Sequence, residues 1–347
     1  MAFKKPVVTE VKSDIQSISI YLRSVKKFGK TTLFRDLILE KFGDPTYGML
    51  VGCGAEVGYN MLDNLNTTQV ESWSDMKELK KWLITQNGKE HHIKMVAFDV
   101  VGELIPMAED EIIKNSTKDT GKICKSFNSA YGAYGEPRKR LLKLFKEYFS
   151  GLIKAGIQPF AIAHTKSKSI KEKGDDTEGY NVLTSDLSND AEGIFGDIFD
   201  CVLTGVIDRD VKDGKITSET RKLYFRGNGY VDAGCRFKYG TVPEYIVFDK
   251  PNMAKDVITV LEEGLRKSRS TAVSDSDFKK IQEEENKKLS PEEEEKLKEE
   301  KVEKIKNSLA NMDMTKLKEI MDEYSVSGFG DPNTVPMECL DKILELI

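Results

Sequence analysis

The chain has 347 residues, 39% of them hydrophobic and 32% charged, with 53 Lys and Arg against 58 Asp and Glu and a formal net charge of −5. This length suggests about two domains, and the mildly acidic balance excludes a surface coated in positive charge, so any contact with nucleic acid must come from local basic segments. No apolar run approaches the roughly 20 residues that span a membrane, and the N-terminus lacks a signal-peptide pattern, so we expect a cytoplasmic protein.

From the start to about residue 266, short β-rich apolar runs alternate with amphipathic helical stretches. This alternation predicts one α/β domain over residues 1–266, with a mostly parallel sheet and helices on both faces. The clearest helix is predicted over Pro137–Ala155, where apolar residues recur at three- and four-residue spacing. The predicted strands are Ser17–Tyr21, Tyr47–Val51, Ile93–Phe98, Gln158–Ala163, Cys201–Val206, Lys222–Phe225 and Tyr245–Phe248.

The first predicted strand leads through a loop into Gly29-Lys-Thr-Thr32 and a helix. A strand, loop and helix in this order surround an anion with backbone N–H groups and the positive end of a helix dipole. Gly29 lets the loop close tightly on phosphate, Lys30 can reach the β and γ oxygens, and the Thr31 hydroxyl can bind Mg²⁺. The predicted contacts to the nucleotide are Ser24, Val25, Lys26, Lys27, Phe28, Gly29, Lys30, Thr31 and Thr32.

The loop departs at one position from the usual pattern G-x-x-x-x-G-K-[ST], because Ser24 stands in place of the first glycine. The first glycine commonly permits a strained backbone, which serine adopts only at a cost. The departure leaves nucleotide binding as the prediction but puts rapid turnover in doubt.

Carboxylates near the ends of later strands complete the predicted site. Asp99 ends a hydrophobic strand, as expected of an acid that binds Mg²⁺ beside Thr31, directly or through water. Two glutamates compete for the role of activating the attacking water. Glu56 follows the second predicted strand and Glu103 follows Asp99 by four residues; both fit the carboxyl edge of a parallel sheet, and we favour Glu56.

Another buried strand, Gln158–Ala163, leads into His164 and Thr165. Polar side chains at this edge can sense a γ-phosphate and pass its presence to the next loop. That loop is locally basic in an acidic protein, which makes its lysines candidates for DNA binding. These lysines are Lys166, Lys168, Lys171 and Lys173.

The composition changes near residue 267. Residues 267–308 have hardly any aromatic or large apolar side chain, which predicts a charged linker, partly helical or disordered. Residues 309–347 regain two apolar helical stripes around a Gly/Pro-rich loop, which predicts a helix-loop-helix module for docking or nucleic-acid binding.

The ordered set of Gly29–Thr32, Glu56, Asp99, His164 and a late Arg236 resembles the RecA-type ATPase core. More narrowly, residues 15–250 are similar to phage-encoded RecA-like nucleotide-binding proteins linked to single-strand annealing and recombination. Three stretches also resemble that group: AYGAYGEPRKRL, IAHTKSK and AGCRFKYGTVPEYIVFD. The resemblance implies ATP with Mg²⁺ as cofactors, single-stranded DNA as partner and a location in the cytoplasm of a phage-infected bacterial cell.

By the same resemblance, Glu56 would activate water, Asp99 would lie beside the metal and His164 would sense the γ-phosphate. Members of the class often complete the site across a subunit boundary. This implies a homo-oligomer in which Arg236 or Lys238 contacts a neighbour's nucleotide.

Three functions follow from these patterns. The first is an ATP-hydrolysing protein on single-stranded DNA in recombination or replication, with slow, DNA-stimulated turnover. The second is a nucleotide-switched scaffold with little ATP hydrolysis, which assembles with phage recombination or replication proteins through its C-terminal module. The third, a small-molecule kinase, is disfavoured because no second acceptor-binding constellation is present in the sequence.

Overall fold

The computed structural model describes residues 15–55, 62–170, 179–212, 215–249, 253–270, 291–309, 312, 314–324, 326, 328–329 and 334–346. The chain divides into two compact units, residues 1–271 and 272–347. The described part of the first unit encloses two hydrophobic cores, and that of the second unit encloses one. Among the described helices, none is both long and apolar enough to cross a lipid bilayer.

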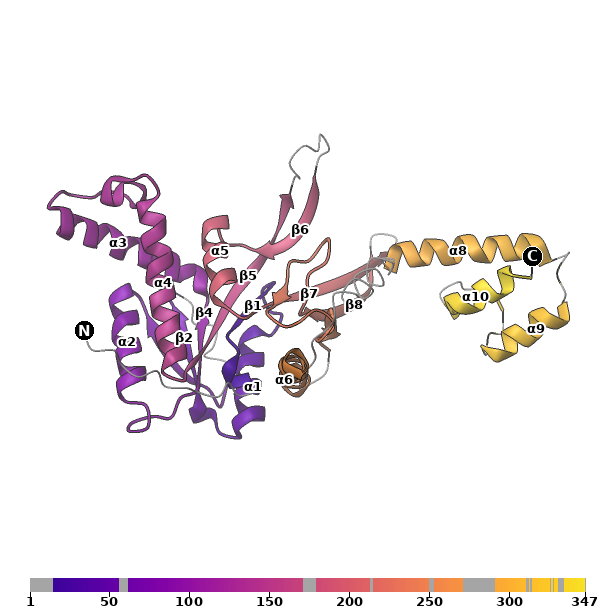
Figure 1. Cartoon of the computed structure of the whole chain (residues 1–347), viewed down its shortest axis with the longest axis horizontal. Coiled ribbons are helices and arrows are strands. Elements are labelled where there is room, and N and C mark those ends of the chain that lie inside the picture. The colour runs from indigo at the N-terminus through magenta and orange to yellow at the C-terminus, as the bar shows by residue number, and fades with distance from the viewer. Residues whose placement is uncertain are drawn as a thin grey trace. The chain divides into compact units, whose positions relative to one another are not determined.

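One sheet runs through the first unit, with the strand order β10-β8-β7-β1-β5-β4-β2-β3 (Figure 1). The strands from β7 to β3 in this order run parallel, whereas β8, β10, β6 and β9 pair antiparallel. The predicted α/β class with a mostly parallel sheet is therefore confirmed. The strands are β1 (Ile20–Ser24), β2 (Gly48–Cys53), β3 (Asn66–Val70), β4 (Met95–Asp99), β5 (Gln158–Ile170), β6 (Tyr180–Ser185), β7 (Cys201–Lys212), β8 (Lys215–Tyr224), β9 (Gly234–Cys235) and β10 (Tyr245–Val247).

Helices cover both faces of this sheet (Figure 1). On β1, Tyr21 packs into the core on one face, while its neighbours Ile20 and Leu22 pack into the core on the other, since successive side chains of a strand alternate. Helices α2 to α5 belong to the first of these cores, and α1 and α6 to the second. The helices are α1 (Lys30–Phe42), α2 (Trp73–Thr85), α3 (Leu104–Thr120), α4 (Glu136–Lys154), α5 (Asn189–Ile198) and α6 (Ala254–Ser270).

The predicted helix Pro137–Ala155 matches α4 to within one residue at each end. Strand β1 lies three residues later than the predicted Ser17–Tyr21, β8 begins at Lys215 instead of Lys222, and β3, β6 and β9 were not predicted. Strands β5 and β7 continue well past Ala163 and Val206. Each continues into an antiparallel hairpin, formed by β5 with β6 and by β7 with β8. Both hairpins project from the body of the sheet (Figure 1).

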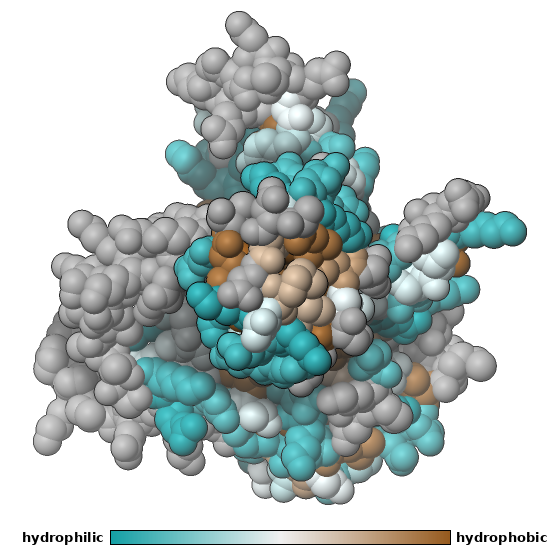
Figure 2. Space-filling model, turned by 90° about the vertical axis from the view of Figure 1, so that its right-hand side faces the viewer, coloured by the Kyte–Doolittle hydropathy of each residue, from teal (hydrophilic) through white to brown (hydrophobic). Residues whose placement is uncertain are grey.

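The second unit contains α8 (Pro291–Ser308), α9 (Met314–Glu323) and α10 (Met337–Leu344). Val302 and Ile305 of α8 pack in one core with Leu317 of α9 and with Leu340 of α10. Helix α8, which the composition placed in the charged linker, thus shares its core with the two helices of the predicted module. Figure 2 looks onto this unit, where apolar residues gather inside a ring of hydrophilic ones.

Candidate nucleotide-binding site

The loop between β1 and α1 has the geometry of an anion-binding turn. Strand β1 ends at Ser24 and α1 begins at Lys30, after Gly29 with a φ of 109°. The first turn of α1 contains no acidic residue, so nothing on this turn opposes the positive end of the helix dipole. Backbone N–H groups at such a helix start are donors for phosphate oxygens.

The sequence placed the backbone strain of the loop at Ser24, but the structure places it at other residues. Ser24 belongs to the extended strand β1, so it needs no left-handed backbone. The left-handed positions are Lys27, with a φ of 64°, and Gly29. A non-glycine residue in this conformation costs of the order of 1–3 kcal/mol and persists where its surroundings fix it.

The neighbouring strand makes room for Ser24. Gly205 of β7 is paired with Ser24 in the parallel register. A Cβ atom at position 205 would lie 2.6 Å from the Phe28 ring and 2.8 Å from Cβ of Ser24. The loop therefore depends on a second glycine besides Gly29, and this glycine, Gly205, lies in the neighbouring strand β7.

The amino group of Lys30 lies inside the curve of the loop. Lys30 is 7% exposed, and its Nζ donates to the carbonyl oxygens of Ser24 and Val25 at 3.1 and 3.2 Å and to the Ser24 hydroxyl at 3.2 Å. The same Nζ lies 3.3 Å from Nδ1 of His164. A buried ammonium in an amide-lined loop can pair strongly with phosphate oxygens.

Thr31 and Asp99 meet beside Lys30. The Thr31 hydroxyl donates to Oδ2 of Asp99 at 2.8 Å, and Asp99 is 7% exposed. Oxygen atoms of this kind suit Mg²⁺, which is usually held by one or two protein oxygens together with substrate phosphates. Among the described residues there is no group of three or more His, Cys, Asp or Glu side chains that could hold a metal ion.

His164 lies on β5, the strand between β1 and β4. It is paired with Ser24 in the register of the sheet. Burial, and then the nearby Lys30 ammonium, lower the pKa of His164 below its usual 6.5. The ring is thus neutral at neutral pH and can accept a hydrogen bond from Lys30.

The two glutamates differ in what the structure describes. Glu56 lies outside the described residues. Glu103 is exposed at the end of a 3-10 turn, Val101–Glu103, that follows β4. Its Oε2 would lie 3.1 Å from a Cβ atom at Gly54, which places Glu103 beside the carboxyl end of β2. Both glutamates remain candidates for activating water.

A hollow of about 410 Å³ opens beside the loop. The rings of Phe28 and Phe248 stack there, with centroids 4.9 Å apart and an interplanar angle of 19°. Gly29 and Thr32 line this hollow, so it adjoins the anion-binding turn. Its lining includes Phe28, Gly29, Thr32, Arg221, Phe248 and Met253. Arg221, Phe248 and Met253 were not predicted from the sequence, because no local motif marks them.

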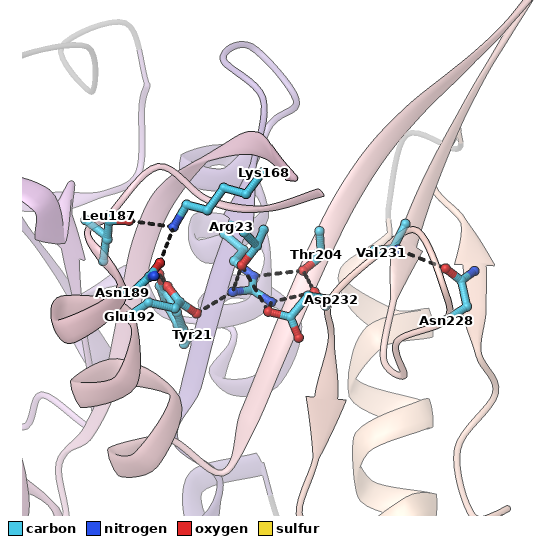
Figure 3. Close-up of polar contacts among 11 residues, drawn as sticks. Tyr21, Arg23, Lys168, Leu187, Asn189, Glu192, Thr204, Asn228, Val231 and Asp232 are labelled. Atoms are coloured by element: carbon cyan, nitrogen blue, oxygen red, sulfur yellow. Dashed lines mark hydrogen bonds and ion pairs between the residues drawn. The ribbon is translucent and has the colours of Figure 1, made fainter. Parts of the chain in front are cut away.

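The basic residues predicted to bind DNA are only partly within the described chain. Lys166 is exposed on β5. Lys168 is half-buried, and its Nζ donates to the Leu187 carbonyl at 2.7 Å and lies 3.5 Å from Oδ1 of Asn189 (Figure 3). Lys171 and Lys173 lie outside the described residues.

Arg236 lies far from the phosphate loop of its own chain. It follows β9, whose Cys235 pairs with Cys201 at the start of β7, whereas the loop follows the end of the parallel strand β1. The Arg236 side chain is 58% exposed and forms an ion pair with Asp200 at 3.3 Å. Arg236 and the exposed Lys238 are thus at the sheet edge opposite to their own site.

The strand order and the loop together define a P-loop NTPase domain of the RecA-like type. In this order one strand, β5, separates the loop strand β1 from the acidic strand β4, and ligands bind at the carboxyl edge of such sheets.

Residues 16–237 match the protein-family model described as "AAA domain". Because this match covers more than half of the 347 residues, the chain belongs to that family. None of the curated proteins matches the chain. Among solved structures it is similar to a KaiC-like protein from the hyperthermophilic archaeon Pyrococcus horikoshii OT3, with 13% identity, 67% of this chain and 90% of that chain covered, and a TM-score of 0.33.

Proposed function

We propose that this protein binds Mg²⁺ and ATP at the loop between β1 and α1 and hydrolyses the ATP. The observation that carries the proposal is the convergence of four side chains. Lys30 lies 3.3 Å from His164, and Thr31 lies 2.8 Å from Asp99. Membership of the AAA domain family supports the same reaction.

Each residue has a separate part in the proposed reaction. The loop amides and Lys30 bind the β- and γ-phosphates, while Thr31 and Asp99 hold Mg²⁺. When bound, the metal neutralises charge on the phosphate oxygens. Glu56 or Glu103 orients the attacking water. His164, whose Nδ1 lies 3.3 Å from Nζ of Lys30, senses the γ-phosphate through Lys30 in this proposal.

We further propose that single-stranded DNA binds along the β5–β6 hairpin. This hairpin continues the strand that bears His164, so a change at the γ-phosphate reaches it through one strand. Lys166 is exposed on it, and Ile170 and Tyr180 are 40% and 42% exposed and directly opposite each other near its tip. Basic side chains with an exposed aromatic ring suit phosphate contacts and base stacking on a single strand.

The protein acts, in this proposal, as a homo-oligomer in phage recombination or replication. Arg236 is exposed at the sheet edge opposite to its own phosphate loop. This position supports a contact with the nucleotide of a neighbouring copy rather than with its own. Lys238 would be the second such contact.

A second candidate function is a nucleotide-switched scaffold with little hydrolysis. The separate helical unit with its own core favours it, since such a unit can bind other recombination or replication proteins while the first unit responds to nucleotide. The two candidates differ in whether phosphate is released.

A titration of a fluorescent ATP analogue with single-stranded and with double-stranded DNA, together with phosphate release, tests the proposal. Lys30→Ala should weaken nucleotide binding about 10- to 100-fold, because a charge-assisted hydrogen bond contributes about 1.5–3 kcal/mol. Lys81→Ala, an exposed lysine of α2, is the matched control and should change nothing. Unchanged binding in Lys30→Ala would overturn the ATP site. Binding without phosphate release, with or without DNA, would favour the scaffold.

A further inference from the structure

The strand that leads into the phosphate loop contains a completely buried arginine. Arg23 immediately precedes Ser24, and its side chain is 0% exposed. An ion buried without partners costs several kcal/mol. The Arg23 side chain therefore depends on the groups around it, which come from four distant parts of the chain (Figure 3).

Two of these groups are hydroxyls. Nε of Arg23 donates to the hydroxyl of Thr204 on β7 at 3.0 Å. Nη1 donates to the hydroxyl of Thr184 on β6 at 3.2 Å. The Thr184 hydroxyl in turn donates to Oδ2 of Asp232 at 3.0 Å, so it connects the guanidinium with one of its acidic partners.

The other two groups are carboxylates. Nη1 of Arg23 forms an ion pair with Oε1 of Glu192, in the first turn of α5. Nη2 forms an ion pair with Oδ2 of Asp232 at 2.7 Å and also donates to the Asp232 carbonyl. Oε2 of Glu192 accepts a hydrogen bond of 2.8 Å from the Tyr21 hydroxyl. We name Tyr21, Arg23, Thr184, Glu192, Thr204 and Asp232 the Arg23 cluster.

The partners of Arg23 lie on both sides of the root of the β5–β6 hairpin. Asp232 belongs to the loop that pairs with β6: its backbone N–H donates to the Leu183 carbonyl at 3.0 Å, and the Leu183 N–H donates to the Tyr230 carbonyl at 2.7 Å. On the other side, the Asp186 N–H, between β6 and α5, donates to the His164 carbonyl at 3.0 Å. The root of the hairpin thus lies between the loop of Asp232, which Arg23 binds directly, and the segment that leads into α5, where Arg23 binds Glu192.

A buried ion cluster is a weak source of stability, because apolar residues of similar volume are often as stabilising. The guanidinium instead fixes the positions of the segments that bind it. Its planar fork of N–H groups fits several acceptors in fixed directions. Here one fork aligns β1, β6, β7, α5 and the 226–233 loop, directly before the residues that curve around Lys30.

We propose that Arg23 is a positioning residue that links the state of the phosphate loop to the position of the β5–β6 hairpin. When nucleotide changes the end of β1, the Arg23 cluster transmits the change to Thr184 and to the segments at the hairpin root. This inference rests on the proposed function, since it needs nucleotide at the loop. It does not need DNA to bind.

Hydrogen–deuterium exchange of the full chain, with and without a slowly hydrolysed Mg²⁺–ATP analogue, tests the link. In the wild-type protein, nucleotide should slow exchange at residues 30–34 and also at 164–170 and 180–185. Arg23→Lys keeps one charge but cannot reach all four acceptors. It should bind the analogue within about threefold of wild type but lose at least about four-fifths of the hairpin protection.

Two further variants separate coupling from folding. Thr184→Val keeps the side-chain shape and removes the hydroxyl between Arg23 and Asp232, and it should also reduce hairpin protection. Ser19→Ala is the matched control. Ser19 is buried just before β1, at the end of the strand that is remote from the phosphate loop, and its hydroxyl donates to Asp200 at 2.7 Å. It should lower the melting temperature and leave hairpin protection unchanged.

The outcomes distinguish the two proposals. Two results would overturn the role of Arg23 and leave the ATP site standing. In the first, nucleotide protects residues 30–34 of the wild-type protein but not its hairpin. In the second, the hairpin is equally protected in Arg23→Lys, Thr184→Val and wild type. Loss of hairpin protection in Ser19→Ala to the same degree as in Arg23→Lys also overturns it, as a general effect of stability. Absence of protection anywhere overturns the proposed function, and this inference with it.

Discussion

The hydroxyl of Thr31 donates a 2.8 Å hydrogen bond to Asp99, a residue 68 positions further along the chain. The contact crosses one strand of the sheet. Strand β5 lies between β1, which leads to Thr31, and β4, which ends at Asp99. It holds one hydroxyl and one carboxylate oxygen side by side at the start of α1. Both are hard oxygen ligands that Mg²⁺ prefers.

Asp99→Asn should therefore separate metal binding from nucleotide binding. Asparagine keeps an oxygen that can accept the Thr31 hydrogen bond but removes the negative charge. We expect the Mg²⁺ concentration at half-maximal ATP hydrolysis to rise at least about tenfold, with nucleotide binding in EDTA unchanged or tighter. Titration of Mg²⁺ against phosphate release measures the first, and fluorescent nucleotide binding the second. The same Mg²⁺ midpoint in the variant would exclude Asp99 from the metal site.

Gly205 allows a serine at the first loop position, so Gly205→Ala should damage the loop from a neighbouring strand. The added methyl group would lie 2.6 Å from the Phe28 ring. Overpacking of this kind costs about 1–3 kcal/mol in the free energy of unfolding, and we expect nucleotide affinity to fall along with it. Urea unfolding and nucleotide titration measure the two effects.

Gly193→Ala is the matched control for this change. A Cβ atom at Gly193, within α5, meets nothing within 4 Å. Because alanine favours a helix over glycine by about 1 kcal/mol, this variant should be as stable as the wild type or more so, with unchanged nucleotide affinity. Equal behaviour of the two alanine variants would contradict the role given to Gly205.

The competing glutamates can be told apart by rate. We expect Glu56→Gln to lower the rate of ATP hydrolysis at least about 100-fold with little change in nucleotide affinity, because the amide cannot take a proton from water. Glu103→Gln should retain most of the activity. Single-turnover hydrolysis and nucleotide binding on the two variants decide between them, and the reverse pattern would assign the role to Glu103.

The parts of the site that the sequence predicted follow from local pattern. Gly29 to Thr32 form a contiguous motif, and Asp99 ends a strongly apolar strand. A parallel sheet brings such strand ends to one edge, so the closeness of Thr31, Asp99 and His164 could be expected once the strand order was assumed. The structure shows that His164 lies next to Lys30, on the strand between β1 and β4.

The parts that the sequence did not predict depend on contacts between distant residues. Arg23 reads as an ordinary polar residue in a strand, and its partners lie 161 to 209 positions away. Gly205 matters only because β7 pairs with β1. Strand β6 and the outer half of β5 are polar and largely exposed near their tip, so no hydrophobic pattern marks them as strands.

His164 offers a direct test of the site's electrostatics. The chain has three histidines, His91, His92 and His164, so the ring resonances of the protein are few and a His164→Gln variant identifies those of His164. Burial and the Lys30 ammonium favour the neutral ring, and they hold the pKa of His164 below 6.5.

This lowered pKa fixes the sign of two effects. As the pH falls below 6.5, the unfolded chain takes up a proton at His164 before the folded chain does, so this group's contribution to the free energy of unfolding is complete above pH 6.5 and is lost toward the folded pKa. A polyphosphate beside Lys30 adds negative charge, which favours the imidazolium. Bound ATP analogue should therefore raise the pKa of His164, as followed by NMR titration of the ring in free and nucleotide-bound protein. An unchanged titration midpoint on saturation with nucleotide would place His164 out of reach of the phosphates and remove it from the proposed site.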